Sequence, residues 1–451
     1  MAEHVVKQGL DIPISGRASG EPVSLELPAT VAYDPTELRG ITPRLSVREG
    51  DAVKQGQALF FHKANPDLVM RSPVSGTVKE VRRGARRVIT DVVVEVGGDE
   101  AETFPTYTQD QIAALSREQA LSALVGSGLW SGLRTRPLDH VADPAMVPQS
   151  ILVCATETGP LQPGSDVLLS DSDAEALQAG VTALKATTDG PVFFTYTTGK
   201  KPGCANGLQG VEMHGFSGPH PSGDSAVQVN LLDPPRGAHV VWTITAWDVV
   251  LMGRFLLEGR FPSERIYAAI GAGVSAPRYV KTVVGAPLSH IAGGTGDGPV
   301  RWIRGSVLTG EAVDGGRWAS AHKRAVHVLP DEVPRSLFGW AMPSLGKYSF
   351  HRAFLSGFTK PSREFDLRPG VFGGERAIVP IGCYSKVVAT PDVMPEFLFK
   401  SIIAGDLEGS LDLGLLDMTV EEAALCTYIC PAKLEYDVLL REGLDLYERE
   451  V

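Results

Sequence analysis

Residues 41–96 constrain the fold of this chain more than any other stretch, because short apolar runs alternate there with glycine turns in two similar halves. The turn residues fall at Glu49-Gly50-Asp51, Gln55-Gly56, Ser75-Gly76 and Arg83-Gly84. Glycine and aspartate supply the backbone conformations that tight turns need. The spacing therefore predicts a compact β module made of short strands.

Apolar residues recur between these turns and form the expected core of the module: Val47, Val53, Leu59, Phe61, Val69, Val78 and Val81. This pattern resembles the biotinyl/lipoyl carrier fold, a barrel-sandwich hybrid. The resemblance implies a modified lysine at the hairpin between the two halves, and Lys63 is the lysine at that place. His62 precedes it, where carrier sites have aspartate or methionine. We therefore expect an unmodified structural module.

Composition bounds the remaining possibilities. The length of 451 residues suggests about three or four domains, and a net charge of −11 gives no reason to expect nucleic acid as a partner. No run approaches the ~18 uncharged apolar residues of a membrane span, and the N-terminus lacks the apolar core of a secretory signal. Five scattered cysteines suit a reducing compartment. We expect a soluble, multidomain, cytoplasmic protein.

The expected fold class is a multidomain α/β protein with four parts. An extended lead-in and the barrel-sandwich module occupy residues 1–104, a Rossmann-like α/β domain 105–260, a small β-grasp-like domain 261–330, and an irregular aromatic segment with a helical domain 331–451. Strands are expected at 151–155, 192–197, 239–245, 265–270, 278–284 and 301–309. Helices are expected at 107–124, 171–187, 246–258, 392–404, 419–429 and 435–449, and a loop at 199–223.

Helix start signals support two of these helices. Ser170 or Ser172 is a possible N-cap for the helix at 171–187. Thr419 and Glu422 make a capping box for the helix at 419–429, in which each side chain bonds a backbone amide of the first turn.

Two fragments could hold a cofactor. The loop from Gly126 to Gly132 could place free amides against a phosphate, although a plain connection is the simpler interpretation. Cys426 and Cys430-Pro431 match the end of a ferredoxin-type cysteine run, but Val420 and Ala423 occupy the first two ligand positions. Two thiolates cannot hold a four-iron cluster, so we expect two small helical residues there.

Other residues give no catalytic constellation. The histidines form no metal pair at helical spacing, and neither a nucleophile elbow nor a Walker loop is present. The four arginines within residues 82–87 could dock on anionic headgroups, with a solvated turn as the alternative. We expect neither a catalytic residue nor a metal ligand in this chain.

Seven motifs follow one another along the chain: GLDIPISG (9–16), SPVSGTV (72–78), RTRP (134–137), GSVLTG (305–310), FGWAMP (338–343), GGERAIVPIG (373–382) and ALCTYICPAK (424–433). Together they resemble the A subunit of the Na⁺-translocating NADH:quinone oxidoreductases over essentially the full length. Each motif alone is weak, but their shared order makes the resemblance specific.

The resemblance implies a peripheral subunit on the cytoplasmic face of the bacterial inner membrane, within a complex of six subunits. It also implies a fold related to the flavin-binding subunit of complex I and to the C subunit of the Rnf complex, which bind FMN at a Gly-rich loop and iron–sulfur clusters at cysteines. In this chain the loop at 126–132 has fewer glycines, and Val420 and Ala423 replace cluster ligands. We therefore expect no cofactor here, with NADH, flavins and iron–sulfur centres on other subunits.

The role that follows is a contribution to quinone reduction coupled to Na⁺ export, next to the membrane-embedded B subunit. A quinone ring needs an apolar slot with a few polar donors. The candidate residues are Trp130, Arg134, Arg136, Pro137, Phe338, Trp340 and Met342. The alternative is a flavoprotein that binds FMN and NADH itself, as the related subunits do.

Overall fold

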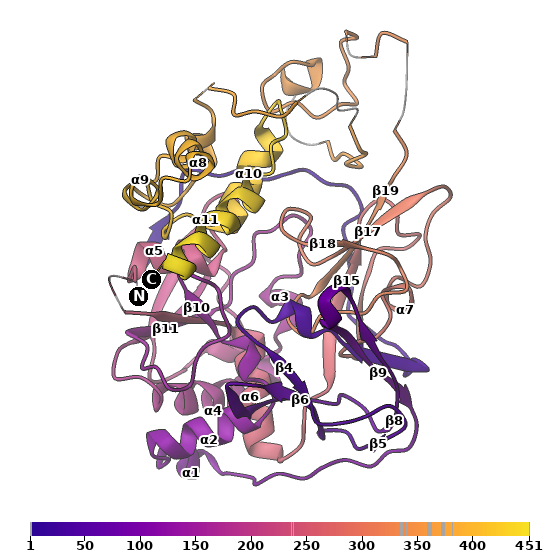
Figure 1. Cartoon of the computed structure of the whole chain (residues 1–451), viewed down its shortest axis with the longest axis vertical. Coiled ribbons are helices and arrows are strands. Elements are labelled where there is room, and N and C mark those ends of the chain that lie inside the picture. Colours follow the sequence, from indigo (N-terminus) through magenta and orange to yellow (C-terminus); the bar gives the residue numbers. More distant parts are fainter. Residues whose placement is uncertain are drawn as a thin grey trace.

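The computed structural model describes residues 2–235, 237, 239–333, 337–339, 341–358, 363–370, 375–380 and 382–450. The described strands form four sheets, and helices cover the α/β part and make up the C-terminal region. Figure 1 places α1, α2 and the barrel-sandwich module at the lower end of the molecule and α8, α9 and α10 at the upper end. Within the described residues, no helix is long and apolar enough to cross a membrane.

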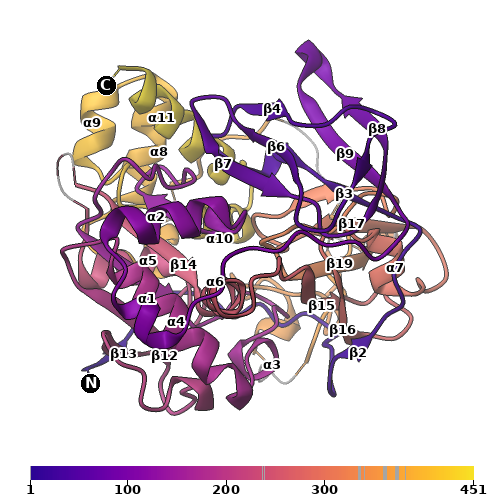
Figure 2. The ribbon, with the colours of Figure 1, turned by 90° about the horizontal axis from the view of Figure 1, so that it is seen from below.

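The barrel-sandwich module consists of two small antiparallel sheets. One has the order β3 (Thr30–Tyr33), β9 (Ile89–Val96), β8 (Gly76–Arg83), β5 (Ala52–Val53), and the other β4 (Pro43–Leu45), β6 (Ala58–His62), β7 (Asn65–Arg71). Lys63 lies in the tight turn between β6 and β7. The module with its neighbouring strands is seen from below in Figure 2.

The predicted core of this module is partly wrong. Val47, Val53, Leu59 and Val78 are buried, but Phe61, Val69 and Val81 are only partly buried. Phe60, Leu68 and Met70 occupy the core instead. Successive residues of a strand face opposite sides, and the β6–β7 register shifts by one residue between Ala58 and Phe60. This shift decides which of two adjacent apolar residues points inward.

The largest α/β unit is a six-stranded sheet. Its order is β1 (Ala2–Val5), β13 (Glu212–Ser217), β12 (Val192–Thr197), β11 (Ser150–Cys154), β14 (Val241–Thr245), β10 (Arg134–Arg136), and only β10 is antiparallel to its neighbour. Leu152 and Cys154 pack with Val229 of α5 (Ser225–Leu232). Ile151 and Val153 belong to the core formed with α4 (Ala174–Lys185) and α6 (Ala246–Glu258). Helices therefore cover both faces.

Some predictions for this unit are confirmed, and others are wrong. The strand at 192–197 and the helix at 246–258 match β12 and α6, and Ser170 caps a 3-10 turn at Asp171–Asp173 that leads into α4. The expected helix at 107–124 is two helices, α1 (Gln109–Ala113) and α2 (Arg117–Gly126), because Ser116 starts a new capping box with Gln119. The expected strand at 239–245 starts only at Val241.

Strand β13 lies inside the segment that was expected to be a loop, and the prediction of a loop at 199–223 is wrong there. Its sequence, EMHGFS, has no apolar alternation and contains a glycine. Pairing on both sides, with β12 and β1, makes it a strand. The short helix α3 (Ser165–Leu168) was also not expected.

The third sheet has the order β18 (Glu311–Val313), β17 (Val300–Arg304), β19 (Ala325–Pro330), β15 (Glu264–Ile270), β16 (Arg278–Val283), β2 (Val23–Ser24), with α7 (Leu288–Ala292) packed on it. The expected strand at 301–309 is wrong beyond Arg304. Gly305 has a φ of +97°, a left-handed conformation that ends the strand.

The C-terminal region contains α8 (Pro395–Ala404), α9 (Leu407–Asp412), α10 (Val420–Ile429) and α11 (Tyr436–Glu450) around a core of its own. The capping box of Thr419 and Glu422 is confirmed. Helix α9 was missed, and α8 begins at Pro395 rather than at Asp392. Proline suits the first helical turn because its missing N–H has no intrahelical partner there.

The first 33 residues run through all four parts. β1 joins the α/β sheet, Ile14 bridges to Phe365 beside the C-terminal core, β2 joins the third sheet, and β3 joins the barrel-sandwich module. The expected extended lead-in therefore supplies strands to three sheets.

Candidate functional site

The Gly-rich loop at residues 126–132 lies between the α/β sheet and the barrel-sandwich module. Arg71 of β7 reaches into this loop and donates to the Gly126 carbonyl from Nε at 2.9 Å and from Nη2 at 2.5 Å. Its Nη1 donates to the Gly56 carbonyl at 2.6 Å. A single, mostly buried guanidinium thus joins the loop to the module.

The loop leaves little room for a ligand of its own. Gly128 has a φ of +81°, and a Cβ there would lie 2.7 Å from Cγ of Arg71. The Leu129 amide donates to Ser127 Oγ at 3.0 Å, and the Leu133 amide donates to the Trp130 carbonyl at 2.9 Å. These two amides already have local partners and Arg71 packs against Gly128, which leaves less of the open amide cradle that a phosphate needs.

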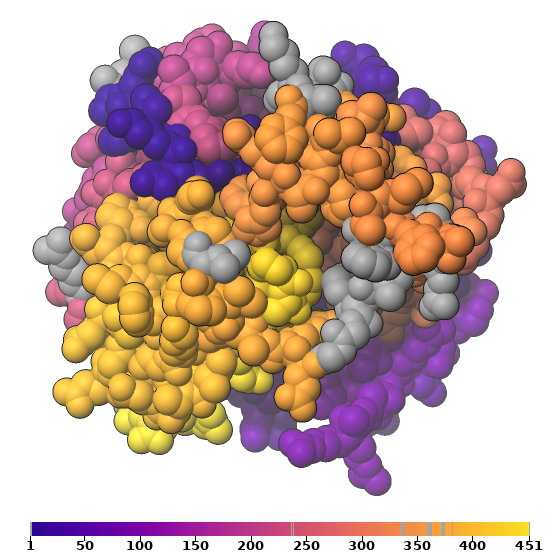
Figure 3. Space-filling model, turned by 90° about the horizontal axis from the view of Figure 1, so that it is seen from above, coloured from indigo at the N-terminus to yellow at the C-terminus, as the bar shows by residue number. Residues whose placement is uncertain are grey.

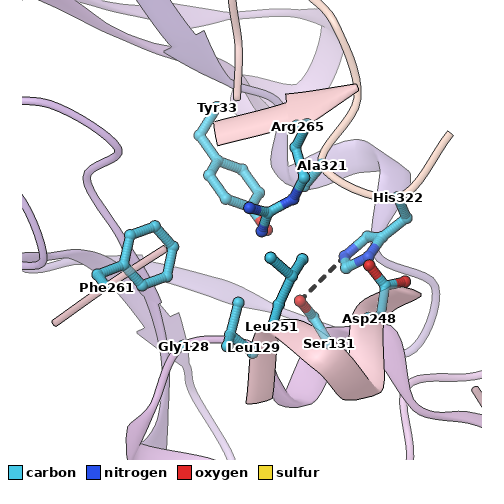
Figure 4. Close-up of a pocket in the computed structure, with 10 residues that line it drawn as sticks. All are labelled: Tyr33, Gly128, Leu129, Ser131, Asp248, Leu251, Phe261, Arg265, Ala321 and His322. Carbon is cyan, nitrogen blue, oxygen red and sulfur yellow. Dashed lines mark hydrogen bonds between the residues drawn. The ribbon is translucent and has the colours of Figure 1, made fainter. Parts of the chain in front are cut away.

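A cavity of about 10 Å³ lies under this loop, where several parts of the chain meet (Figure 4). Its walls are Tyr33, Gly128, Leu129, Ser131, Asp248, Leu251, Phe261, Arg265, Ala321 and His322. This volume holds about one water molecule, whereas pockets for drug-sized ligands measure roughly 300–1,000 Å³. Neither a flavin nor a quinone ring fits here in this arrangement.

Three groups around the cavity, His322, Tyr33 and Arg265, have pKa values far from neutral pH. Burial lowers the pKa of His322 to about 3, so its imidazole is neutral, and its Nε2 lies 3.1 Å from Ser131 Oγ. Burial raises the pKa of Tyr33 to about 12 and lowers that of Arg265 to about 10. The phenol is therefore protonated and the guanidinium charged at pH 7.

Open α/β sheets bind nucleotides at the carboxyl ends of their strands, where the strand order reverses. In this sheet the order reverses between β11 and β14. Gln228 of α5 lies beside the carboxyl ends of β11 and β12, since its Nε2 donates to Thr156 Oγ1 at 2.7 Å and its Oε1 accepts from Thr195 Oγ1 at 2.6 Å. Thr156 also donates to the Gly223 carbonyl at 3.0 Å. The polar groups at the ends of β11 and β12 are thus hydrogen-bonded to one another.

A second polar cluster joins the α/β sheet to the third sheet and the C-terminal helices. His220 Nε2 lies 3.3 Å from Glu421 Oε1, and Glu421 accepts from Thr309 Oγ1 at 2.6 Å and from Ser306 Oγ at 2.9 Å. Sequence reasoning missed this cluster because its members are far apart along the chain. The GSVLTG motif, which supplies Ser306 and Thr309, was its one visible signal.

Burial and pairing set the charges of this cluster. Burial opposes a charged His220, but the hydrogen bond and charge of Glu421 outweigh it and raise the pKa of His220. Burial likewise opposes a charged Glu421, yet its hydrogen bonds lower the pKa of Glu421. Glu157 accepts from the Gly159 amide at 2.6 Å, and burial raises the pKa of Glu157 to about 7.

The first group of quinone candidates lies around β10. Trp130 is only 1% exposed, donates from Nε1 to the Ala142 carbonyl at 2.7 Å and packs edge-on against Trp242. Arg134, Arg136 and Pro137 are half-buried, and Arg136 lies 3.6 Å from Asp139. Trp130 therefore packs in the core, whereas Arg134 and Arg136 lie partly exposed at the edge of the core.

The second group lies in the segment after the third sheet. Phe338 is 64% exposed and Met342 is 59% exposed, and the Met342 amide donates to the Phe338 carbonyl at 3.2 Å. Trp340 lies outside the described residues. In Figure 1 this segment is at the top of the molecule and β10 is well below it, so the structure does not bring the two groups together.

Three of the cysteines meet in the C-terminal core. Cys426 and Cys430 are buried on α10 and at its end, and Cys383, which sequence spacing had set apart, is buried in the same core. Tyr384 Oη donates to Cys430 Sγ at 3.3 Å. Across the described residues, no three His, Cys, Asp or Glu side chains gather as metal ligands would.

Comparison with protein-family models gives three matches. Residues 4–97 match the model described as NqrA N-terminal barrel-sandwich hybrid domain, residues 115–261 the NqrA second alpha/beta domain, and residues 268–315 the NQRA C-terminal domain. The predicted barrel-sandwich fold of the N-terminal module is thereby confirmed.

Full-length relatives carry one name. The chain is 39% identical over 456 residues to the A subunit of the Na(+)-translocating NADH-quinone reductase of Pasteurella multocida, covering 99% of both chains. It is 39% identical to that of Vibrio atlanticus and 36% identical to that of Neisseria meningitidis, again over 99% of both chains. A solved structure of an NAD⁺-reducing [NiFe]-hydrogenase aligns with 51% of this chain and 49% of its own length. The sequence identity is 15% and the TM-score is 0.37, which is too low to indicate a shared fold.

Proposed function

Because the chain belongs to the family of the A subunit of the Na⁺-translocating NADH-quinone reductases, we propose that it contributes to quinone reduction without a redox cofactor of its own. It is one component of an oxidoreductase complex. In the proposed arrangement it sits on the cytoplasmic face of the bacterial inner membrane, beside the membrane-embedded B subunit, as one of six subunits. NADH, flavins and iron–sulfur centres belong to the other subunits.

The observation that carries the cofactor-free proposal is the closed seam under the Gly-rich loop. The amides of Ser127, Leu129 and Gly132 are bonded locally, Arg71 occupies the approach to Gly126, and the cavity below measures about 10 Å³. FMN would need an open cradle at this loop. The residues present do not fit that group.

We also propose a finer division of the fold. Between residues 1–104 and 331–451 lie two domains, a Rossmann-like α/β domain at 105–260 and a β-grasp-like domain at 261–330. The reversal of strand order between β11 and β14, with helices on both faces, supports the first of these.

Contact with quinone is proposed at either group of candidate residues. Phe338 and Met342 are exposed and could meet a quinone or another protein of the complex directly. Arg134 and Arg136 are half-buried and could donate to quinone carbonyls only at the edge of β10, whereas Trp130 would support Pro137 and its neighbours from the core. A quinone photoprobe in the assembled complex tests this, and labelling of neither segment would contradict it.

Purification from bacterial membranes through an affinity tag on this chain tests the main proposal. Recovery of membrane-embedded subunits together with NADH:quinone activity is the expected result. A lone protein would count against the proposal. The rival function, a flavoprotein that binds FMN and NADH, predicts that the purified chain keeps the yellow absorbance of a flavin.

A further inference from the structure

Figure 3 views the upper face of the molecule, where the orange segment after the third sheet covers one side. This segment exposes large apolar side chains, each with half or more of its surface open: Leu337, Phe338, Met342, Leu345, Leu355 and Phe358. Most single exposed apolar residues need no explanation, but a concentration of them in one segment marks a binding surface. We call these six residues the apolar patch.

The charge around the apolar patch differs from that of the whole protein. Residues 333–363 contain five Lys and Arg and no Asp or Glu, in a chain of net charge −11. Lys347 Nζ donates to the Gly339 carbonyl and lies 5.0 Å from the centre of the Phe354 ring, and Arg363 donates to the Leu345 carbonyl at 3.0 Å. These contacts hold the loop, and within the described residues neither Lys347 nor Arg363 forms an ion pair.

Arg352 is the third described cation of this segment. Among the described residues, none makes a hydrogen bond or an ion pair with the Arg352 guanidinium, and the residue is exposed. An arginine beside exposed aromatic and aliphatic side chains can contact a phosphate while its neighbours enter an apolar phase.

The base of the segment is attached to α10. His351 Nε2 donates to the Ile429 carbonyl at 2.7 Å, and the Tyr348 ring lies 5.5 Å from the Tyr428 ring. These contacts attach the segment that carries the apolar patch to helix α10.

Charge distinguishes the apolar patch from the exposed apolar residues of helix α8. Helix α8, near the same face, also exposes Phe397 (59%) and Ile403, but its one cation, Lys400, is paired with Glu396 at 2.8 Å. An anionic bilayer would therefore attract that helix less than the acid-free segment around Arg352.

We propose that the apolar patch binds the headgroup region of an anionic phospholipid bilayer. Phe338, Met342 and Phe358 enter the boundary between headgroups and acyl chains, and Arg352 contacts lipid phosphates. This contact with lipid goes beyond the proposed role in quinone reduction and does not depend on where quinone binds.

Flotation of the purified full-length chain with vesicles tests the proposal. Binding is expected to vesicles of phosphatidylethanolamine and phosphatidylglycerol, to weaken with added salt, and to be lost with phosphatidylcholine alone. Phe338→Ser combined with Phe358→Ser should weaken binding about tenfold, and Arg352→Gln about fivefold. Substitution of exposed side chains should leave the thermal unfolding temperature unchanged, which checks that the variants fold.

Matched controls exist on the same chain. Phe397→Ser removes a similarly exposed phenylalanine from helix α8, where the one cation is already paired with Glu396, and Arg86→Gln removes an exposed arginine whose φ of 53° is close to the 55° of Arg352. Both should bind vesicles as the unchanged protein does.

Equal binding to neutral and anionic vesicles would overturn the proposal. So would a loss of binding in Arg86→Gln that Arg352→Gln does not share, or patch variants that lose membrane subunits in co-purification but still float with vesicles.

Discussion

At the scale of single residues, Gly128 is the clearest case of a glycine that the tertiary structure requires. Its left-handed φ of +81° and the 2.7 Å approach of Arg71 Cγ to the place of a Cβ both disfavour any other residue. Gly50 has a similar φ of +88° but open space around it. Comparison of the two glycines separates the cost of backbone strain from the cost of a steric clash.

Gly128→Ala should lower the free energy of unfolding by about 1–2 kcal/mol more than Gly50→Ala does, since only the first adds a clash. Urea unfolding of both variants measures this. In an Arg71→Ala background the extra cost should shrink, because the opposing side chain is gone. Equal costs at the two glycines would show that the contact with Arg71 is unimportant.

Glu157 gives a prediction about pH. Burial raises its pKa from 4.5 to about 7, so between these pH values the folded chain keeps a proton that the unfolded chain has lost. Stability from this group therefore falls as pH rises through that range. Glu157→Gln keeps the acceptor for the Gly159 amide and removes the titration.

Relative to the unchanged protein, Glu157→Gln should gain about 2 kcal/mol in unfolding free energy between pH 5 and pH 8. Urea unfolding at the two pH values checks this. Asp224, His220 and Glu421 face the same cluster. His220, whose pKa is raised, adds stability below about pH 6.5 that is lost as pH rises, so some pH dependence should remain. An identical pH profile in the variant would contradict the assignment.

At the scale of elements, buried ion pairs join sheets that lie far apart along the chain. Arg304 of β17, buried in the third sheet, lies 2.8 Å from Asp34 Oδ2 and 3.2 Å from Glu37 Oε1, next to the barrel-sandwich module. Arg317 continues this contact to Asp91 of β9 at 2.8 Å.

Arg304→Met should cost about 3 kcal/mol of unfolding free energy, because it removes the most buried cation of the cluster and leaves Asp34 with Arg317 and Glu37 with the more distant Lys323. Arg368→Met is the control, since Arg368 is largely exposed and lies 3.6 Å from its carboxylates. That variant should cost less than about 1 kcal/mol. Similar midpoints of denaturation for the two variants would argue against a buried joint.

At the scale of the whole molecule, the N-terminal segment holds the parts together. Residues 2–16 supply β1 to the α/β sheet and bury Ile12 and Ile14 in the C-terminal core. Their removal should cost about 4 kcal/mol or more, given two buried isoleucines and a lost strand. Removal of residues 449–450, which are exposed, should cost almost nothing.

Limited proteolysis distinguishes the outcomes for the truncated chain. Cleavage within α8–α11 should become faster when residues 2–16 are absent, because the core under these helices loses its cover. Unchanged cleavage in that region would show that the N-terminal segment is dispensable for the C-terminal core.

Some elements were predictable because their causes are local. The helix at 246–258 and the capping box of Thr419 and Glu422 depend on residues three or four apart. The strand at 192–197 is a run of β-branched and aromatic residues, the types that favour strands. The order of seven motifs was enough to place the chain in its family, because that order can be read from the sequence without knowledge of the fold.

The tertiary structure decided what depends on distant partners. β13 became a strand through β1 and β12, and Phe60 rather than Phe61 entered the core through a shift in register. Arg71 closes the Gly-rich loop, and Cys383 joins Cys426 in one core. None of these contacts leaves a local pattern, because the free energy that favours each comes from groups tens to hundreds of residues away.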